Sequence, residues 1–326
     1  MSAKQILKVA LAAGILVFVA LRVDLSAAFA LIADADLARL SVAIFASLLI
    51  IVADAAFWAH AMRPVGLKMA FRTALLFGIV GWFFATLSPS NVGSDLFRAA
   101  QMRYAGATTD RSIRLVAAAR LMSLAALIAV IGAGLPYALM TFDDARDRIA
   151  LATIFAIAVS AFSAFVLLGP LAARLPSHWR LPGMGLVAGL AADTRTLLAK
   201  TAPSGWFLLI VQHLLRVAGV ALVAWSLAID IKLLALFALV SPALLVAMVP
   251  LSIGGWGVRE ASFVYFLGFA GVAAPAALAI SIVFGLTRII IGAVGGIVWT
   301  IARADQYKFA VEAPDAATKI EAHAES

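Results

Sequence analysis

Residues 250–260 read Pro-Leu-Ser-Ile-Gly-Gly-Trp-Gly-Val-Arg-Glu, and they place an arginine, a glutamate and three glycines between two strongly apolar stretches. A charged side chain at membrane depth costs at least about 2.5 kcal/mol on insertion scales. Non-helical backbone is tolerated there only where protein or a water-filled cavity covers it. The segment is therefore either a covered turn inside the membrane or part of a binding site.

The composition of the whole chain is that of a polytopic membrane protein. Of its 326 residues, 64% are hydrophobic and 13% are charged, and the mean hydropathy is +1.07. These values exclude an ordinary soluble domain. The absence of cysteine excludes disulfides, thiol catalysis and cysteine-based zinc sites. The net charge of +8 is explained by basic residues that flank membrane spans, so we expect no nucleic-acid partner.

Six apolar stretches are predicted to be full membrane spans. They are Val9 to Leu21, Leu40 to Met62, Leu121 to Met140, Ile149 to Leu171, a span that Trp206 opens, and Ala276 to Ile301. Two further apolar stretches, Thr73 to Leu87 and Leu233 to Val249, are short and end at Pro89 and Pro250. About fifteen helical residues reach only ~22 Å, which is less than the ~30 Å hydrocarbon core.

Between the spans, basic residues mark the segments on the cytoplasmic side. Leu96 to Arg120 is a mixed stretch in which Asp110 is predicted to cap an amphipathic helix that begins at Arg111. Ala172 to Pro203 is predicted to be an interfacial segment.

The distribution of Lys and Arg separates two topologies. If every apolar stretch crosses, eight spans place 11 of the 25 basic residues inside and 12 outside. If the two short stretches are re-entrant hairpins, six spans place 17 inside and 6 outside. The positive-inside rule favours the second topology, which places both termini in the cytoplasm. We expect the protein to lie in the inner membrane of a bacterial cell.

An internal repeat supports the same topology. Four residues recur at an offset of 161, namely Pro89, Gly93, Arg98 and Tyr104 as Pro250, Gly254, Arg259 and Tyr265. The predicted fold class is therefore all-α: a polytopic membrane helix bundle of six full spans plus two re-entrant helical hairpins that form an inverted repeat, eight membrane elements in total. We expect one domain over residues 1–303, with repeat halves at about 40–140 and 206–301, and a disordered polar tail over 304–326.

The two loops resemble motifs of the flippase-like membrane domain of the lysylphosphatidylglycerol synthase family. The first motif, Pro-x3-Gly-Gly-Asp-x2-Arg, is matched by Pro89, Gly93, Asp95 and Arg98, with Ser94 in the second glycine position. The second, Pro-x-Ser-x-Gly-Gly-x-Gly-x-Arg-Glu, is matched in full by Pro250, Ser252, Gly254, Gly255, Gly257, Arg259 and Glu260. The likeness extends from about Lys4 to Arg303.

This resemblance implies the translocating half of the family's activity, which is the movement of a lipid between leaflets. Bifunctional members carry a soluble aminoacyltransferase domain after the membrane part, and this sequence continues only to Ser326. We therefore expect a translocator and not an enzyme, without a cofactor. Stand-alone members are linked to varied lipids, so the resemblance does not name the lipid.

The second loop supplies one set of candidate substrate-binding residues. Gly254, Gly255 and Gly257 allow the backbone to approach a head group and to turn N–H groups toward a phosphate. Arg259 and Glu260 are either part of the same site or a structural ion pair. The alternative for the glycines is that they serve only the sharp turn.

The second set comes from the first loop and from the spans that follow each loop. Asp95 and Arg98 are the counterpart near the inner face, where Arg98 is suited to bidentate phosphate binding; its alternative is a topology anchor. Arg120 and Arg288 are suited to an anionic head group, and Arg288 lies deep in its span and needs an internal partner. Asp54 and Arg216 are the expected partners.

Asp54 is also a candidate for coupling transport to protons, with a structural salt bridge as the alternative. His60 and His213 show no metal-ligand spacing and are interpreted as packing residues, so no metal site is predicted. The expected partner is a membrane lipid with an anionic or polyprenyl-phosphate-type head group. Competing hypotheses are an integral-membrane enzyme and an accessory subunit that works with a lipid or glycan synthase.

Overall fold

The computed structural model describes residues 21–61, 63, 68–88, 92–104, 107–172, 184–248 and 256–301. The predicted first span, up to residue 20, and the tail from residue 302 lie outside the described residues. So do Pro89, Pro250, Ser252, Gly254 and Gly255.

All elements formed by the described residues are helices. In chain order they are α2 (Leu25–Ala33), α3 (Leu37–Ala61), α4 (Phe71–Thr86), α5 (Val92–Tyr104), α6 (Thr109–Thr141), α7 (Ala145–Ala172), α8 (Met184–Lys200), α9 (Pro203–Ser226), α10 (Leu233–Ala247), α11 (Val258–Gly268) and α12 (Ala274–Ile301). The predicted all-α class is confirmed as a polytopic helical bundle.

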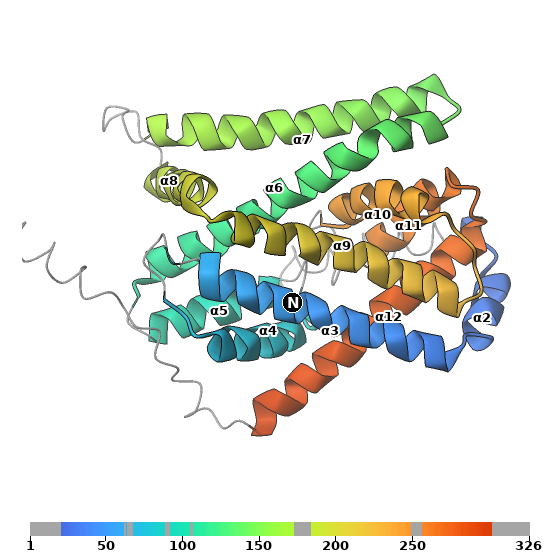
Figure 1. Ribbon diagram of the computed structural model, residues 1–326, viewed down its shortest axis with the longest axis horizontal. Helices are drawn as coiled ribbons and strands as arrows, with labels where there is room; N and C mark the ends of the chain where they lie inside the picture. The colour runs from blue at the N-terminus through green and yellow to red at the C-terminus, as the bar shows by residue number, and fades with distance from the viewer. Residues whose placement is uncertain are drawn as a thin grey trace, which may run out of the picture.

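Five of these helices are long and apolar enough to cross a membrane, namely α3, α6, α7, α9 and α12. They correspond to the five predicted spans that fall on described residues. In Figure 1, α3, α7 and α9 run close to the long axis of the molecule, and α6 and α12 are inclined to it. The short helices α4 and α10 are apolar too, with 16 and 15 residues.

One prediction about a helix boundary was wrong, and one short helix was not predicted. Asp110 does not cap a separate amphipathic helix, because α6 is one helix of 33 residues and its N-cap is Thr108. The Thr108 hydroxyl accepts the N–H of Arg111 at 3.3 Å, and no helix breaker separates the charged first turns of α6 from its apolar part. The helix α2 was not predicted; the carboxylate of Asp24 caps it by accepting the N–H of Ala27 at 3.0 Å.

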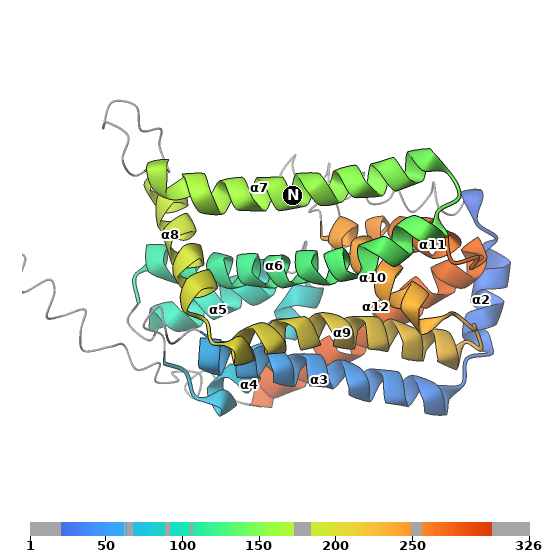
Figure 2. The ribbon, with the colours of Figure 1, turned by 45° about the horizontal axis from the view of Figure 1, so that its top comes forward.

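The helices before α7 and those after α8 form two groups with the same order of long and short helices. The first group is α3 to α6 and the second is α9 to α12, and each consists of a long, two short and a long helix. The pairs α4–α5 and α10–α11 lie toward opposite ends of the bundle (Figures 1 and 2). The helix α4 packs on α12, and α10 packs on α6, so each group contributes its first short helix to the other.

Small residues allow these exchanged helices to approach closely. A β-carbon at Gly295 of α12 would overlap the backbone oxygen of Ile79 in α4, and one at Gly134 of α6 would lie 2.9 Å from the Cα of Ala238 in α10. Gly292 and Gly296 also lie against α4, and small residues commonly serve such close packing between membrane helices.

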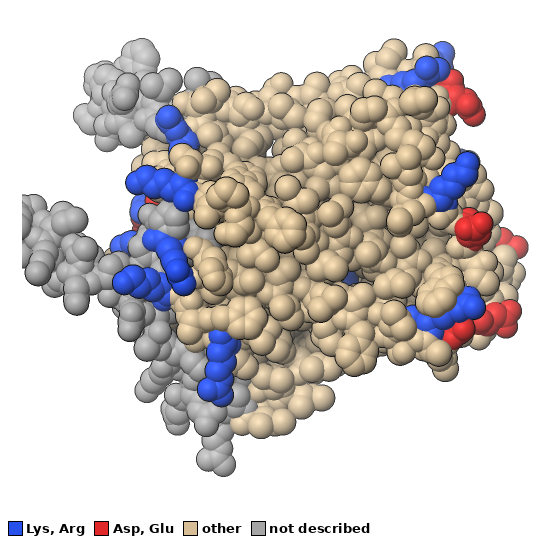
Figure 3. Space-filling view, in the orientation of Figure 1, with Lys and Arg blue, Asp and Glu red and all other residues tan. Residues whose placement is uncertain are grey.

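The hydrophobic core has two main parts, and each surrounds one pair of short helices. One part centres on α10 and α11 and includes Phe263 and Leu239. The other centres on α4 and the start of α6 and includes Phe77 and Met122. The charged side chains visible in Figure 3 gather at the two ends of the molecule, with an apolar surface between them, as lipid contact requires.

Candidate functional site

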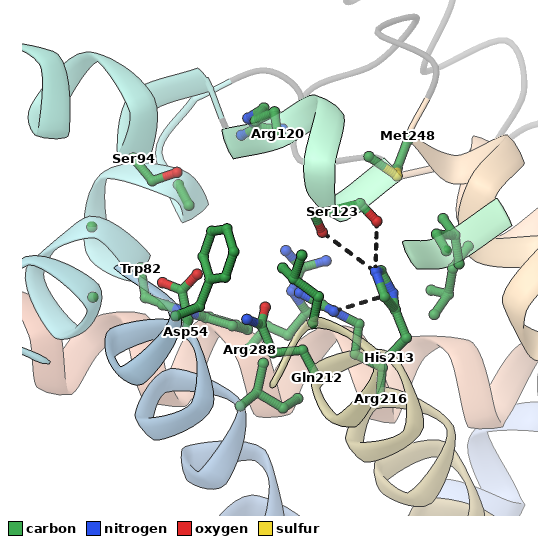
Figure 4. Close-up of a pocket in the computed structure, with 18 of the residues that line it drawn as sticks. Asp54, Trp82, Ser94, Arg120, Ser123, Gln212, His213, Arg216, Met248 and Arg288 are labelled. Atoms are coloured by element: carbon green, nitrogen blue, oxygen red, sulfur yellow. Dashed lines mark hydrogen bonds between the residues drawn. The ribbon is translucent and has the colours of Figure 1, made fainter. Parts of the chain in front are cut away.

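A cavity of about 240 Å³ lies inside the bundle, and eight helices line it. The lining residues come from α3 to α6 and from α9 to α12, so both groups of helices build it and α7 and α8 do not. Figure 4 shows Asp54, Arg216 and Arg288, which come from three different helices, around this shared space. The cavity is the place where the two groups meet.

The lining of the cavity is rich in arginine. Among the described residues, it contains five arginines, Arg98, Arg120, Arg216, Arg259 and Arg288, and two aspartates, Asp54 and Asp95. Arg288 lies near the middle of the 28-residue helix α12, and Arg216 lies near the middle of the 24-residue helix α9. Charges at this depth are expensive in hydrocarbon, so they indicate a hydrated or ligand-binding interior.

Two ion pairs hold α5 against its neighbours. The guanidinium of Arg98 pairs with the carboxylate of Asp54 on α3 and lies 4.8 Å from the ring centroid of Trp58. One turn earlier on α5, Asp95 pairs with Arg120 on α6. The sequence predicted Asp54 as a partner of Arg288, but Asp54 forms its ion pair with Arg98. Both ion pairs link different helices, so they fix the position of α5.

The Arg259–Glu260 pair is organised differently, because both residues belong to α11. The carboxylate oxygen Oε1 of Glu260 accepts from Nη2 of Arg259 at 2.6 Å and from the hydroxyl of Ser281 at 3.2 Å. Its other oxygen, Oε2, accepts the N–H of Gly257 at 2.5 Å. Gly257 has a φ of +88°, which glycine adopts without strain. Glu260 is 1% exposed and is absent from the cavity lining, so it acts as a structural anchor.

Arg259 itself reaches the cavity between an aromatic ring and a helix backbone. Its Cζ lies 4.4 Å from the ring centroid of Trp256. On the other side, a β-carbon at Gly285 of α12 would lie 2.7 Å from the same Cζ. The absence of a side chain at Gly285 therefore leaves the space that the guanidinium occupies.

A hydrogen-bonded chain positions Arg216. Nη1 of Arg216 lies 3.3 Å from Nδ1 of His213, and Nε2 of His213 lies 2.9 Å from the backbone oxygen of Ser123 (Figure 4). Since arginine only donates, Nδ1 accepts and Nε2 carries the proton that is donated to Ser123. This arrangement requires a neutral imidazole, because a second proton on Nδ1 would face the guanidinium.

Arg288 sits among groups of the same sign. Its guanidinium lies 5.3 Å from the ring centroid of Trp82, a cation–π distance. Arg259 and Arg216 line the same cavity, and their positive charges act on Arg288. A bound anion would relieve the mutual repulsion of these three arginines.

The structure brings together six of the predicted site residues. Asp54, Asp95, Arg98, Arg120, Arg259 and Arg288 all line the cavity. Gly257 and Glu260 support Arg259 from behind, and Gly254 and Gly255 lie outside the described residues. The sequence did not identify Ser123, Trp82 or Gly285 as contributors, and it interpreted His213 as a packing residue. These residues contact segments that are distant in the sequence, and no local sequence pattern predicts such contacts.

Among the described residues, no group of three or more histidine and acidic side chains is placed to hold a metal ion. The polar groups of the cavity are instead donors, because five guanidinium groups face two carboxylates. Such a set is suited to phosphate or another anion.

Comparison with known families gives a match over most of the chain. The family described as lysylphosphatidylglycerol synthase TM region matches residues 5–296. No curated protein matches the chain. The matched range includes every residue of the cavity lining.

Proposed function

The chain belongs to the lysylphosphatidylglycerol synthase transmembrane family, and on this premise we propose that it is a lipid translocator. It moves a lipid with an anionic or polyprenyl-phosphate-type head group between the leaflets of a bacterial inner membrane. The head group passes through the arginine-lined cavity while the acyl or prenyl chains stay in the hydrocarbon.

The single observation that carries this proposal is the pair of arginines at the middle of long apolar helices. Arg216 and Arg288 both line the cavity near the midpoints of α9 and α12. Burying such charges has a cost that a structural role does not explain, whereas an anion that crosses the membrane meets its greatest barrier at this depth. The arginines lower this barrier by replacing water around the head group.

The proposal includes the finer topology: six full spans, two re-entrant pairs, α4–α5 and α10–α11, and both termini in the cytoplasm. The placement of the two pairs toward opposite ends of the bundle supports it. So does the sequence offset of 161, which relates Arg98 to Arg259 and also Arg120 to Ser281. Arg120 and Ser281 also make corresponding contacts. Arg120 of α6 pairs with Asp95 of α5, and Ser281 of α12 donates to Glu260 of α11.

The carboxylates of Asp54 and Asp95 make the binding of a head group in the cavity reversible. Asp54 and Asp95 hold Arg98 and Arg120 through ion pairs. A phosphate that enters competes for the same guanidinium groups, and it leaves when the carboxylates take them back. Binding that is strong and unopposed would trap the lipid halfway. No chemical step on the lipid is part of this cycle, so we propose a translocator rather than an enzyme.

The test is leaflet exchange in reconstituted liposomes. Fluorescently labelled phosphatidylglycerol or a polyprenyl phosphate is followed by quenching from outside the liposome. We expect faster exchange with the protein than without it, and a loss of about tenfold or more in Arg288→Gln. Arg103→Gln, an exposed residue at the end of α5, is the matched control and should retain the rate. Exchange no faster than in empty liposomes, for any anionic lipid, would refute the proposal.

A further inference from the structure

The charges around the cavity do not balance. Besides the two lining aspartates, Glu260 contributes a third carboxylate through its pair with Arg259. Five arginines therefore face three carboxylates. His213 adds no charge, because its Nδ1 accepts from Arg216. The described site has an excess of two positive charges.

No other acidic residue of the bundle corrects this excess. Asp110 and Asp193 pair with Arg114, where α6 meets α8, and Asp36 pairs with Arg39 at the other end of the bundle. The remaining acids of residues 21–301 lie at helix ends or in turns: Asp24, Asp34, Asp143, Asp144, Asp147 and Asp230. The loop segments 89–91 and 249–255 contain no ionisable side chain in the sequence.

We infer that the cavity is built for a head group with two negative charges, as a phosphomonoester dianion has, rather than for a singly charged phosphodiester. This inference rests on the proposed function, because it names the class of lipid that the same cavity would carry. A dianion neutralises the site, whereas a diester leaves one positive charge in a low-dielectric interior. Because electrostatic interactions are strong in such an interior, the second charge contributes substantially to binding.

The arrangement of donors fits the same class. Arg98, Arg216 and Arg288 come from α5, α9 and α12, so they approach the cavity from different helices. A phosphomonoester presents three terminal oxygens and can accept from three directions, whereas a phosphodiester presents two. Guanidinium forks match these oxygens in bidentate geometry.

The size of the cavity points to a small head group. Its volume of about 240 Å³ is below the roughly 300–1,000 Å³ of pockets that hold drug-sized ligands. A phosphate and a few waters of roughly 30 Å³ each fit this space. The lipid class that we infer is therefore a lipid phosphomonoester, such as phosphatidic acid or a polyprenyl monophosphate.

The experiment compares phosphatidic acid with phosphatidylglycerol of the same acyl chains. Both are titrated into the purified full chain in detergent, and binding is read from the intrinsic fluorescence of the tryptophans, of which Trp58 and Trp82 line the cavity. At pH 8 we expect phosphatidic acid to bind about tenfold more tightly or better. At pH 5.5 the preference should shrink, because the second pKa of a phosphomonoester lies near 6.

Substitutions test whether the preference for phosphatidic acid comes from the cavity or from basic residues on the surface. Arg288→Gln and Arg216→Gln each remove one charge from the site, and each should reduce the preference for phosphatidic acid several-fold. The exposed pair Arg103→Gln/Arg195→Gln removes two surface charges, and it should leave the preference unchanged. Helical content and monodispersity of each variant establish that it is folded; if one site variant does not fold, the other decides.

The outcomes distinguish this inference from the proposed function. Equal affinity for the two lipids, a preference independent of pH, or a preference lost in the surface pair would overturn the dianion inference. Each would leave lipid exchange in liposomes untouched. Conversely, a preference for phosphatidic acid without any lipid exchange would uphold the dianion site and refute translocation.

Discussion

The guanidinium of Arg259 lies against the Cα of Gly285, in space that any side chain at Gly285 would fill. Trp256 covers the other side of the same group at 4.4 Å. We therefore expect Gly285→Ala to push Arg259 out of its position while α12 remains helical. Lipid exchange in liposomes should fall about tenfold.

Gly268→Ala is the matched control, since a β-carbon at Gly268 meets nothing within 4 Å. It should retain the wild-type exchange rate. Full activity in Gly285→Ala would show that the placement of Arg259 does not matter for transport.

The His213 ring makes two hydrogen bonds that different substitutions remove separately. In His213→Asn, the amide oxygen can replace Nδ1 as the acceptor for Arg216; in His213→Gln, the amide nitrogen can replace Nε2 as the donor to Ser123. If His213 positions Arg216, Asn should keep exchange within about threefold of wild type, and Gln should lower it by about tenfold. The reverse order of the two variants would contradict this role.

The Asp54–Arg98 pair predicts that Asp54 serves as the ion-pair partner of Arg98 rather than as a proton-coupling group. Their side chains are 19% and 13% exposed, so Asp54→Asn leaves a largely buried guanidinium without its carboxylate. We expect the free energy of unfolding to fall by about 1–3 kcal/mol, which lies between the values for exposed and for fully buried ion pairs. The pH dependence of lipid exchange should keep its shape; a profile that flattens in this variant would instead support proton coupling.

The close approach of α4 and α12 depends on Gly295. In Gly295→Ala the new methyl group would overlap the backbone oxygen of Ile79, so the two helices must separate. Overpacking of this kind costs about 1–3 kcal/mol, which a lower thermal unfolding midpoint would reveal. Gly185→Ala, where nothing lies within 4 Å, should have no such effect. Equal midpoints for both variants would show that the contact is not tight.

The proposed topology predicts the accessibility of single cysteines, which the cysteine-free chain allows one to introduce without background. Arg103→Cys, at the end of α5, should react with a membrane-impermeant reagent only from the cytoplasmic side. Ala273→Cys, between α11 and α12, should react only from the opposite side. Both positions are exposed. Labelling of both from the same side would exclude the inverted arrangement of the two short pairs.

Much of the architecture could be predicted because hydrophobicity acts locally along the chain. Four of the five described spans were placed within a few residues, since about twenty apolar residues in succession have few alternatives to a membrane helix. The exception is α6, which begins at Thr109 and not at Leu121. Asp110 failed as a helix cap because Thr108 lies two residues earlier and its hydroxyl accepts the N–H of Arg111. Several residues near one helix start were able to cap it, and only the backbone geometry decides among them.

The sequence by itself determined the class of the protein, its long helices, the two charged motifs around Arg98 and Arg259, and its family. Only the tertiary structure decided which charges meet. It paired Asp54 with Arg98 and Asp95 with Arg120, and it joined His213 to Arg216 inside one cavity. The physical reason is range: hydrophobic periodicity is read within one helix, whereas an ion pair depends on how helices far apart in the chain pack together.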